Sequence, residues 1–236
     1  EISCSLVGSE MCIRDRNICY TIFVKKIIGS RKMIGYYSYT VILTYLSLVF
    51  AMAGIHLSFN GMYQWAFICL IMCGICDTFD GMVARSKKNR TDEEKRFGIQ
   101  IDSLCDLVAF GVFPAILGYN VGLSSIGWLA IEIFYVLAAV IRLAYFNVKE
   151  ETRQQETDEK RKYYQGLPVT TSSFILPLAY AFRYVIFELS YLYGALMLIT
   201  GVLFIVDFKV PKVQSKGLVA LGILVIIELI QIVVMK

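Results

Sequence analysis

Proline is scarce in this sequence, and the cysteines lack the spacing of a disulfide-bonded protein. Only four prolines occur in 236 residues, as expected of a chain that is mostly helix. The seven cysteines are an odd number without a framework spacing, which argues against a disulfide scaffold. Cys73 and Cys76 form a C-x-x-C pair, but no histidine lies near them, which argues against a zinc or redox motif.

Apolar residues are present in excess. They make up 57% of the chain, against about 45–50% in a soluble domain, and the mean hydropathy is +0.63. A membrane-spanning helix needs about 20 apolar residues, so the pattern predicts an all-α, polytopic membrane bundle. Spans are expected at residues 36–57, 62–84, 99–119, 125–147, 168–187, 189–206 and 217–235. The first is too long, and too far into the chain, for a cleavable signal peptide.

Lysine and arginine gather on one side of the predicted spans. Of the 23 basic residues, 21 fall in the segments 14–32, 85–96, 142–162 and 209–216, whereas loops 58–61 and 119–124 hold none. Basic loops remain cytoplasmic, so we expect a cytoplasmic N-terminus. We divide the chain into an N-terminal cytoplasmic segment, 1–35, and a membrane domain, 36–236. Residues 1–16, neither periodic nor apolar, are a candidate non-native extension.

Four aspartates lie where the second predicted span ends and the third begins: Asp77, Asp80, Asp102 and Asp106. An ionised aspartate near the bilayer costs roughly 2.5–3.5 kcal/mol on insertion scales, so four of them require a compensating cation. Their i,i+3 and i,i+4 spacings put each pair on one helix face. Because a short loop joins the two spans, we expect antiparallel neighbours whose carboxylates meet at the cytoplasmic end.

Carboxylate clusters of this kind suit hard cations such as Mg²⁺, Mn²⁺ or Ca²⁺. Two such ions about 3.5–4 Å apart can clamp a pyrophosphate. Gly81, Ala84 and Arg85 share the face of Asp77, and Gly98 shares the face of the second pair. The small residues let a nucleotide approach the backbone, and Arg85 offers donors to phosphate.

Two other interpretations account for the same carboxylates. Acidic pairs at helical spacing often mark a solvated helix end, although this explains one pair better than two. A cation- or proton-coupled transporter also uses intramembrane carboxylates, but transporters tend to bind near the midplane, at broken helices. The predicted cluster instead lies at the cytoplasmic rim, and the sequence has no visible repeat.

The run Asp77-x2-Asp80-Gly81-x2-Ala84-Arg85, followed after twelve residues by Gly98-x3-Asp102-x3-Asp106, resembles the signature of the CDP-alcohol phosphotransferase family. Its spacer is one helical turn longer than in many members. The segments 102–108, 142–147 and 166–168 are similar to the CDP-diacylglycerol–serine phosphatidyltransferases of that family.

The resemblance implies an enzyme of phospholipid biosynthesis that transfers a phosphatidyl group from CDP-diacylglycerol to L-serine and releases CMP. It implies six core membrane helices, with one more at the C-terminus here, a homodimer, and no nucleic-acid partner. Two Mg²⁺ or Mn²⁺ ions would be held by Asp77, Asp80, Asp102 and Asp106. Asp106 would also be the general base. The nucleotide would be bound by Asp80, Gly81, Ala84, Arg85 and Gly98.

The acceptor alcohol is less specified than the reaction. Arg142 and Asn147 are candidates for binding the serine carboxylate, since arginine binds carboxylates in a bidentate fork. The same chemistry with glycerol phosphate, an inositol phosphate or an archaeal-type ether lipid stays open. We expect Thr44 to be a packing residue, with a contact to the nucleotide as the alternative, and Thr170 to be a helix cap or a helix-packing residue.

Overall fold

The computed structural model describes residues 35–87, 91–156, 163–183, 188–211 and 215–234. Contacts divide the chain into two compact units, Glu1–Tyr36 and Tyr37–Lys236, and the fold below is that of the second. The predictions made for segment 14–32 and for residues 1–16 lie outside the described residues.

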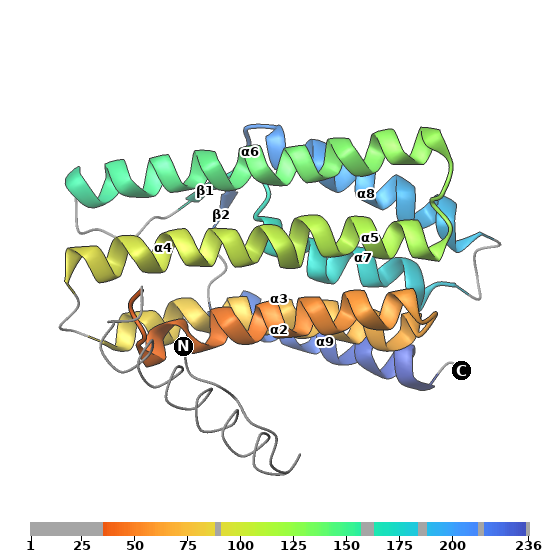
Figure 1. The fold of residues 1–236 in the computed structure, drawn as a ribbon, viewed down its shortest axis with the longest axis horizontal. Helices are drawn as coiled ribbons and strands as arrows, with labels where there is room; N and C mark the ends of the chain where they lie inside the picture. The colour runs from red at the N-terminus through yellow and green to blue at the C-terminus, as the bar shows by residue number, and fades with distance from the viewer. Residues whose placement is uncertain (1–34, 88–90, 157–162, 184–187, 212–214, 235–236) are drawn as a thin grey trace, which may run out of the picture. The chain divides into compact units, whose positions relative to one another are not determined.

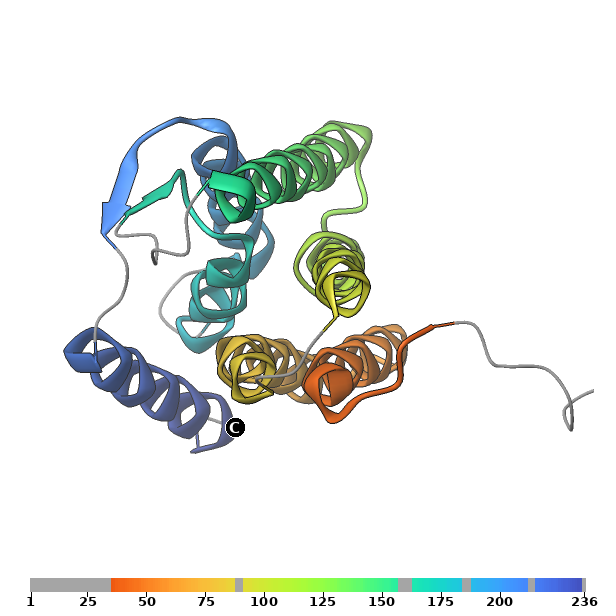
Figure 2. The ribbon, with the colours of Figure 1, turned by 90° about the vertical axis from the view of Figure 1, so that its left-hand side faces the viewer.

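Helices make up nearly all of this unit, and they run side by side as a bundle (Figures 1 and 2). The α-helices are α2 (Ile42–Phe59), α3 (Tyr63–Ser86), α4 (Asp92–Asp106), α5 (Phe113–Val121), α6 (Ile126–Glu156), α7 (Ser172–Ala181), α8 (Leu189–Ile205) and α9 (Ser215–Val234). Short turns are η1 (Tyr39–Val41), η2 (Leu107–Val112) and η3 (Val169–Thr171). The predicted helical class is confirmed.

Four helical stretches of the described chain are long and apolar enough to cross a bilayer. They are Tyr39–Phe59, Tyr63–Ala84, Asp92–Val121 and Ile126–Thr152, and three shorter apolar helices follow. Large apolar side chains such as Val49, Ile133 and Ile226 lie exposed on the outside of the bundle. Such a surface suits lipid rather than water. The prediction of seven spans is therefore supported for four, and the full number stays a prediction.

Helix α4 begins earlier than the predicted span, which started at residue 99. Thr91 caps its N-terminus: the Thr91 hydroxyl accepts a hydrogen bond from the Glu94 backbone N–H at 3.2 Å. Asp92, Glu93 and Glu94 fill the first turn, where the helix dipole favours negative charge. Much of the basic segment 85–96, expected as a loop, is thus helix, because a Thr-x-x-Glu cap is a start signal that apolarity alone misses.

Glycines let neighbouring helices approach one another. A Cβ added at Gly54 of α2 would overlap the Phe113 ring of α5, and one at Gly74 of α3 would overlap the Ser173 side chain of α7. Small residues serve the same purpose at helix contacts within membranes. This close packing holds α2 against α5 and α3 against α7, around a core that includes Phe67 and Phe110, both fully buried.

A short antiparallel ribbon, which the sequence did not predict, ties the loop before α7 to the loop after α8. Strand β1 (Tyr163–Gln165) pairs with β2 (Lys209–Pro211) in this part of the chain. Next to the ribbon, the Gly166 N–H donates to the Phe208 carbonyl at 2.8 Å. Gly166 has a positive φ of 70°, and a Cβ there would lie 3.1 Å from the Val206 carbonyl oxygen, so glycine suits the position. The ribbon therefore sets the path of the chain into η3 and α7.

Candidate active site

Three of the four predicted aspartates come together between α3 and α4. Carboxylate oxygens of Asp77, Asp102 and Asp106 all lie within 4.8 Å of one another. Asp106 is buried, and Asp77 and Asp102 are half-buried. The i,i+4 spacing on α4 points both of its carboxylates toward Asp77, as the helical period requires.

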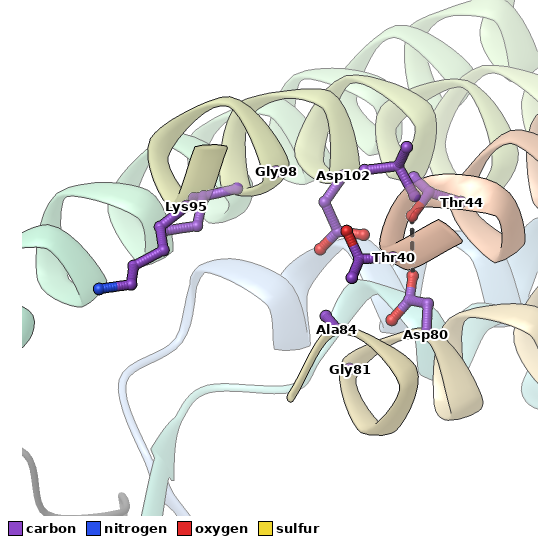
Figure 3. A pocket seen from close by; sticks show the side chains of 10 residues that line it. Thr40, Thr44, Asp80, Gly81, Ala84, Lys95, Gly98 and Asp102 are labelled. Atoms are coloured by element: carbon purple, nitrogen blue, oxygen red, sulfur yellow. Dashed lines mark hydrogen bonds between the residues drawn. The ribbon is translucent and has the colours of Figure 1, made fainter. Parts of the chain in front are cut away.

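Asp80 joins this group from the next turn of α3. Its side chain is buried, and one carboxylate oxygen accepts a hydrogen bond from the Thr44 hydroxyl of α2 at 3.4 Å (Figure 3). The Thr44 hydroxyl also reaches Asp102. We refer to Asp77, Asp80, Asp102 and Asp106 together as the carboxylate cluster.

The carboxylate cluster concentrates negative charge inside the helical bundle. No ion pair within the described ranges involves any of its four members. Like charges at such short separations oppose ionisation unless a cation lies between them. An all-oxygen set of carboxylates is what hard divalent cations prefer. The residues present therefore fit a divalent metal site.

A small pocket of about 120 Å³ opens beside the carboxylate cluster. It is lined by Thr40, Val41, Thr44, Asp80, Gly81, Ala84, Lys95, Gly98, Ile99 and Asp102. These residues come from η1 and the start of α2, from the end of α3, and from α4 (Figure 3). The short side chains at Gly81, Ala84 and Gly98 leave room next to the backbone. The pocket thus provides space directly against two of the carboxylates.

The structure places most predicted nucleotide-binding residues in this pocket. Asp80, Gly81, Ala84 and Gly98 all line it. Arg85 belongs to the last turn of α3, but its side chain lies outside what the structure describes.

Two residues at the site were not predicted, and a third makes a contact beyond the packing role expected of it. Thr40 and Lys95 line the pocket, and Thr44, expected as a packing residue, contacts the carboxylate cluster. Lys95 shares a helix face with Gly98 and Asp102, since the three stand at i, i+3 and i+7. That spacing was available in the sequence. The Lys95 ammonium group pairs with the Asp92 carboxylate at 3.0 Å and points away from Asp102 (Figure 3).

Thr170 approaches the opposite side of the carboxylate cluster. Its hydroxyl interacts with the Asp77 carboxyl, and Thr170 is not a helix cap as expected, since Pro168 and Thr171 occupy the N-cap positions of η3 and α7. No local signal reveals the contact, because Thr170 and Asp77 are far apart in the chain.

The two predicted acceptor-binding residues lie outside the pocket lining and are engaged with protein groups. Arg142 is buried, and its Nε donates to the Leu167 carbonyl at 3.1 Å. The Asn147 side-chain oxygen accepts a hydrogen bond from the Ser103 hydroxyl at 2.8 Å. Ser103 adjoins Asp102, so Asn147 lies near the level of the carboxylate cluster.

Residues 39–208 match the family model described as CDP-alcohol phosphatidyltransferase. The chain is 40% identical over 116 residues to the CDP-diacylglycerol–serine O-phosphatidyltransferase of Saccharomyces cerevisiae, covering 48% of this chain and 41% of that protein. It is 30% identical over 179 residues to the protein of the same name from Helicobacter pylori, and the match covers 71% of this chain and 70% of that protein. It is 34% identical over 184 residues to the archaetidylserine synthase of Methanothermobacter thermautotrophicus, and the match covers 73% of this chain and 70% of that protein. The chain thus spans less than half of the yeast relative's length.

Proposed function

We propose that this chain, which belongs to the CDP-alcohol phosphatidyltransferase family, transfers a phosphatidyl group from CDP-diacylglycerol to L-serine and releases CMP. The observation that carries the proposal is the carboxylate cluster beside a pocket lined by small residues, within helices apolar enough for a bilayer. The names of the yeast and Helicobacter pylori relatives support serine as the acceptor.

The carboxylate cluster fits a divalent cation, and we assign its four aspartates as the ligands of Mg²⁺ or Mn²⁺, with two ions in the site. When bound, the metal neutralises the charge that develops on the pyrophosphate. Gly81, Ala84 and Gly98 leave space for the nucleotide beside the backbone, and Arg85 provides donors to its phosphates.

Asp106 is the group to which we assign the proton transfer. It is buried among carboxylates at the end of α4, where its own side chain can accept a proton. The serine hydroxyl oxygen forms a bond to the phosphatidyl phosphorus, and the bond from that phosphorus to the CMP oxygen breaks. Asp106 takes the hydroxyl proton, and CMP leaves.

Serine recognition by Arg142 and Asn147 stays a prediction. In this structure the Arg142 Nε donates to the Leu167 carbonyl and the Asn147 side-chain oxygen accepts from Ser103, so both side chains already contact protein groups. The cytoplasmic position of the active site rests on the distribution of basic residues, and the homodimer rests on the family alone.

The direct test is CMP release by purified protein in the presence of Mn²⁺ or Mg²⁺. CDP-diacylglycerol is offered with L-serine, glycerol 3-phosphate, inositol phosphate or no acceptor. We expect release only with serine. Release with another alcohol would keep the reaction and replace the acceptor, and no release with any acceptor would refute the proposal.

Asp106→Asn tests the assignment of the base. Loss of a general base lowers the rate by about 100- to 10,000-fold, and we expect a fall in kcat within that range. The matched control is Asp207→Asn, an exposed aspartate in the loop after α8. Full activity in Asp106→Asn would assign the proton to another group.

A second candidate lipid is favoured by one observation. The archaeal relative, called archaetidylserine synthase, is matched over 73% of this chain. An ether-linked CDP-archaeol should therefore be compared with CDP-diacylglycerol in the same assay. A much larger kcat/KM for the ether lipid would make the product archaetidylserine.

A further inference from the structure

The helix that carries Asp106 changes its winding directly after that residue. Helix α4 ends at Asp106, and Leu107–Val112 form a π-helical turn that leads without interruption into α5. The Phe113 N–H bonds to the Val108 carbonyl, five residues back instead of four. A π-turn inserts one residue into a helix, and such turns are frequent at functional sites.

Pro114 gives a physical reason for the irregular winding. In a regular α-helix, the N–H of residue 114 would bond to the Phe110 carbonyl, but proline has no N–H, and its ring clashes with the carbonyl four residues back. The Phe110 carbonyl therefore needs another donor. In a membrane interior, an unsatisfied carbonyl is costly because no water reaches it.

That donor comes from α6. The Tyr135 hydroxyl donates to the Phe110 carbonyl at 2.6 Å, and the Tyr135 side chain is fully buried. The Ser172 hydroxyl of α7 lies 3.4 Å from the same carbonyl and bonds mainly to Val169 at 2.8 Å.

Close packing holds α6 against the π-turn. A Cβ added at Gly111 would lie 3.4 Å from the Ala139 Cβ, an ordinary van der Waals distance, so the π-turn packs directly against α6. Ala139 and Tyr135 stand one turn apart on α6 and are both fully buried. The Tyr135 hydroxyl is thus fixed by its surroundings rather than free to follow the turn.

The π-turn also sets the direction of Asp106. Each residue of an α-helix rotates the next side chain by about 100°. One inserted residue therefore changes the angle between the face of α4 that carries the carboxylates and the apolar face of η2 and α5. With the π-turn, both faces can point into the bundle. Here Asp106 points to the carboxylate cluster, while Phe110 and Phe113 point into the core.

We propose that Tyr135 is a positioning residue for the reaction: its hydroxyl anchors the Phe110 carbonyl to α6 and so fixes the π-turn that aims Asp106 at the carboxylate cluster. The inference rests on the proposed function and adds to it a residue that touches neither substrate nor metal.

The test is Tyr135→Phe, which removes only the hydroxyl. We expect kcat for CMP release to fall by about tenfold to a hundredfold, as for a misplaced catalytic group, with the KM for CDP-diacylglycerol unchanged. We also expect weaker Mn²⁺ binding, measured by electron paramagnetic resonance of added Mn²⁺ in the absence of substrate.

Tyr193→Phe is the matched control. Tyr193 of α8 is also fully buried, and its hydroxyl donates to the Pro114 carbonyl at 2.8 Å, farther along the helix from Asp106. Both variants lose one buried hydrogen bond, so both should lower the Tm. Only Tyr135→Phe should change kcat and Mn²⁺ affinity. Equal effects of the two variants on kcat and Mn²⁺ affinity, or none from Tyr135→Phe, would overturn the proposal.

The Mn²⁺ measurement separates this proposal from the proposed function. If the wild-type protein releases no CMP with any acceptor, the reaction is refuted, and the Mn²⁺ affinities of the two variants still decide the role of Tyr135. If Tyr135→Phe does not fold, Pro114→Ala is added to it, because an N–H at position 114 restores a donor to the Phe110 carbonyl. The helix can then wind regularly without the π-turn that aims Asp106, so we expect this double variant to bind Mn²⁺ weakly. Wild-type Mn²⁺ affinity would overturn the proposal.

Discussion

At the scale of single side chains, the carboxylate cluster combines repulsion with a capacity to bind cations. Asp77, Asp102 and Asp106 bring their oxygens within 4.8 Å of one another, and Asp80 lies beside them with Thr44 as a hydrogen-bond donor. Removing water from such a group strengthens both the repulsion and the attraction for a metal ion. The folded protein should therefore be less stable without a metal than with it.

Metal binding should be visible as thermal stabilisation. A ligand at 100 times its Kd adds about 2.7 kcal/mol of stability, which corresponds to a rise in Tm of roughly 5–10 °C for a chain of this size. We expect Mn²⁺ added to chelator-treated protein in detergent to raise the Tm by that amount. The rise should be smaller in Asp77→Asn and unchanged in the exposed control Asp207→Asn. An equal rise in both variants would contradict a metal site at the carboxylate cluster.

Thr44→Val tests the hydroxyl that contacts Asp80. Valine keeps the shape of the side chain and removes the donor. A hydrogen bond to a charged group contributes about 1.5–3 kcal/mol, and the 3.4 Å separation favours the weak end of that range. We expect the KM for CDP-diacylglycerol to rise by about tenfold, measured in the CMP assay.

The control for this change is Thr200→Val. Thr200 of α8 is equally buried, but its hydroxyl donates to the Leu196 carbonyl of its own helix. It should keep the wild-type KM. A KM that rises equally in both variants would mean that Thr44 acts only through packing.

At the scale of helices, the site depends on close contact between α2 and α5. The Phe113 ring fills the space left by the missing side chain at Gly54, and Phe113 directly follows the π-turn that leads away from Asp106. The contact is therefore part of the support of the active site, although neither residue approaches the pocket.

Gly54→Ala should destabilise the protein. An added Cβ overlaps the Phe113 ring, and overpacking of a core costs about 1–3 kcal/mol. We expect a lower Tm in detergent. Gly127→Ala is the matched control, because a Cβ at this position of α6 meets nothing within 4 Å, and alanine favours helix over glycine by about 1 kcal/mol. An unchanged Tm in Gly54→Ala would mean that α2 and α5 can separate without cost.

At the scale of the whole molecule, the distribution of basic residues predicts the orientation in the membrane. The basic residues predict that the end with the carboxylate cluster faces the cytoplasm. Ser124 lies exposed in the loop between α5 and α6, and Glu151 lies exposed near the opposite end of α6. These two positions report on opposite sides of the bilayer.

We expect a membrane-impermeant maleimide to label Ser124→Cys in intact cells and Glu151→Cys only after the cells are broken. The parent protein measures the background from its native cysteines. The reverse pattern would place the active site on the outer side and refute the predicted topology.

The sequence by itself determined the helical class, the membrane-spanning character and the four aspartates. A bilayer of fixed thickness requires long apolar runs, and the period of the helix decides which carboxylates share a face. These are local properties, so they can be predicted without knowing which helices are neighbours. The spacing from Asp77 to Asp106 also carried the resemblance to the family, which the match over residues 39–208 confirms.

The tertiary structure alone decided which distant groups meet the site. Thr44 and Thr170 reach the carboxylates from α2 and η3, Arg142 holds the Leu167 carbonyl, and Tyr135 anchors the π-turn. Each contact joins residues at least 25 positions apart. Apolar periodicity carries no information about such pairs, because the packing of whole helices brings them together.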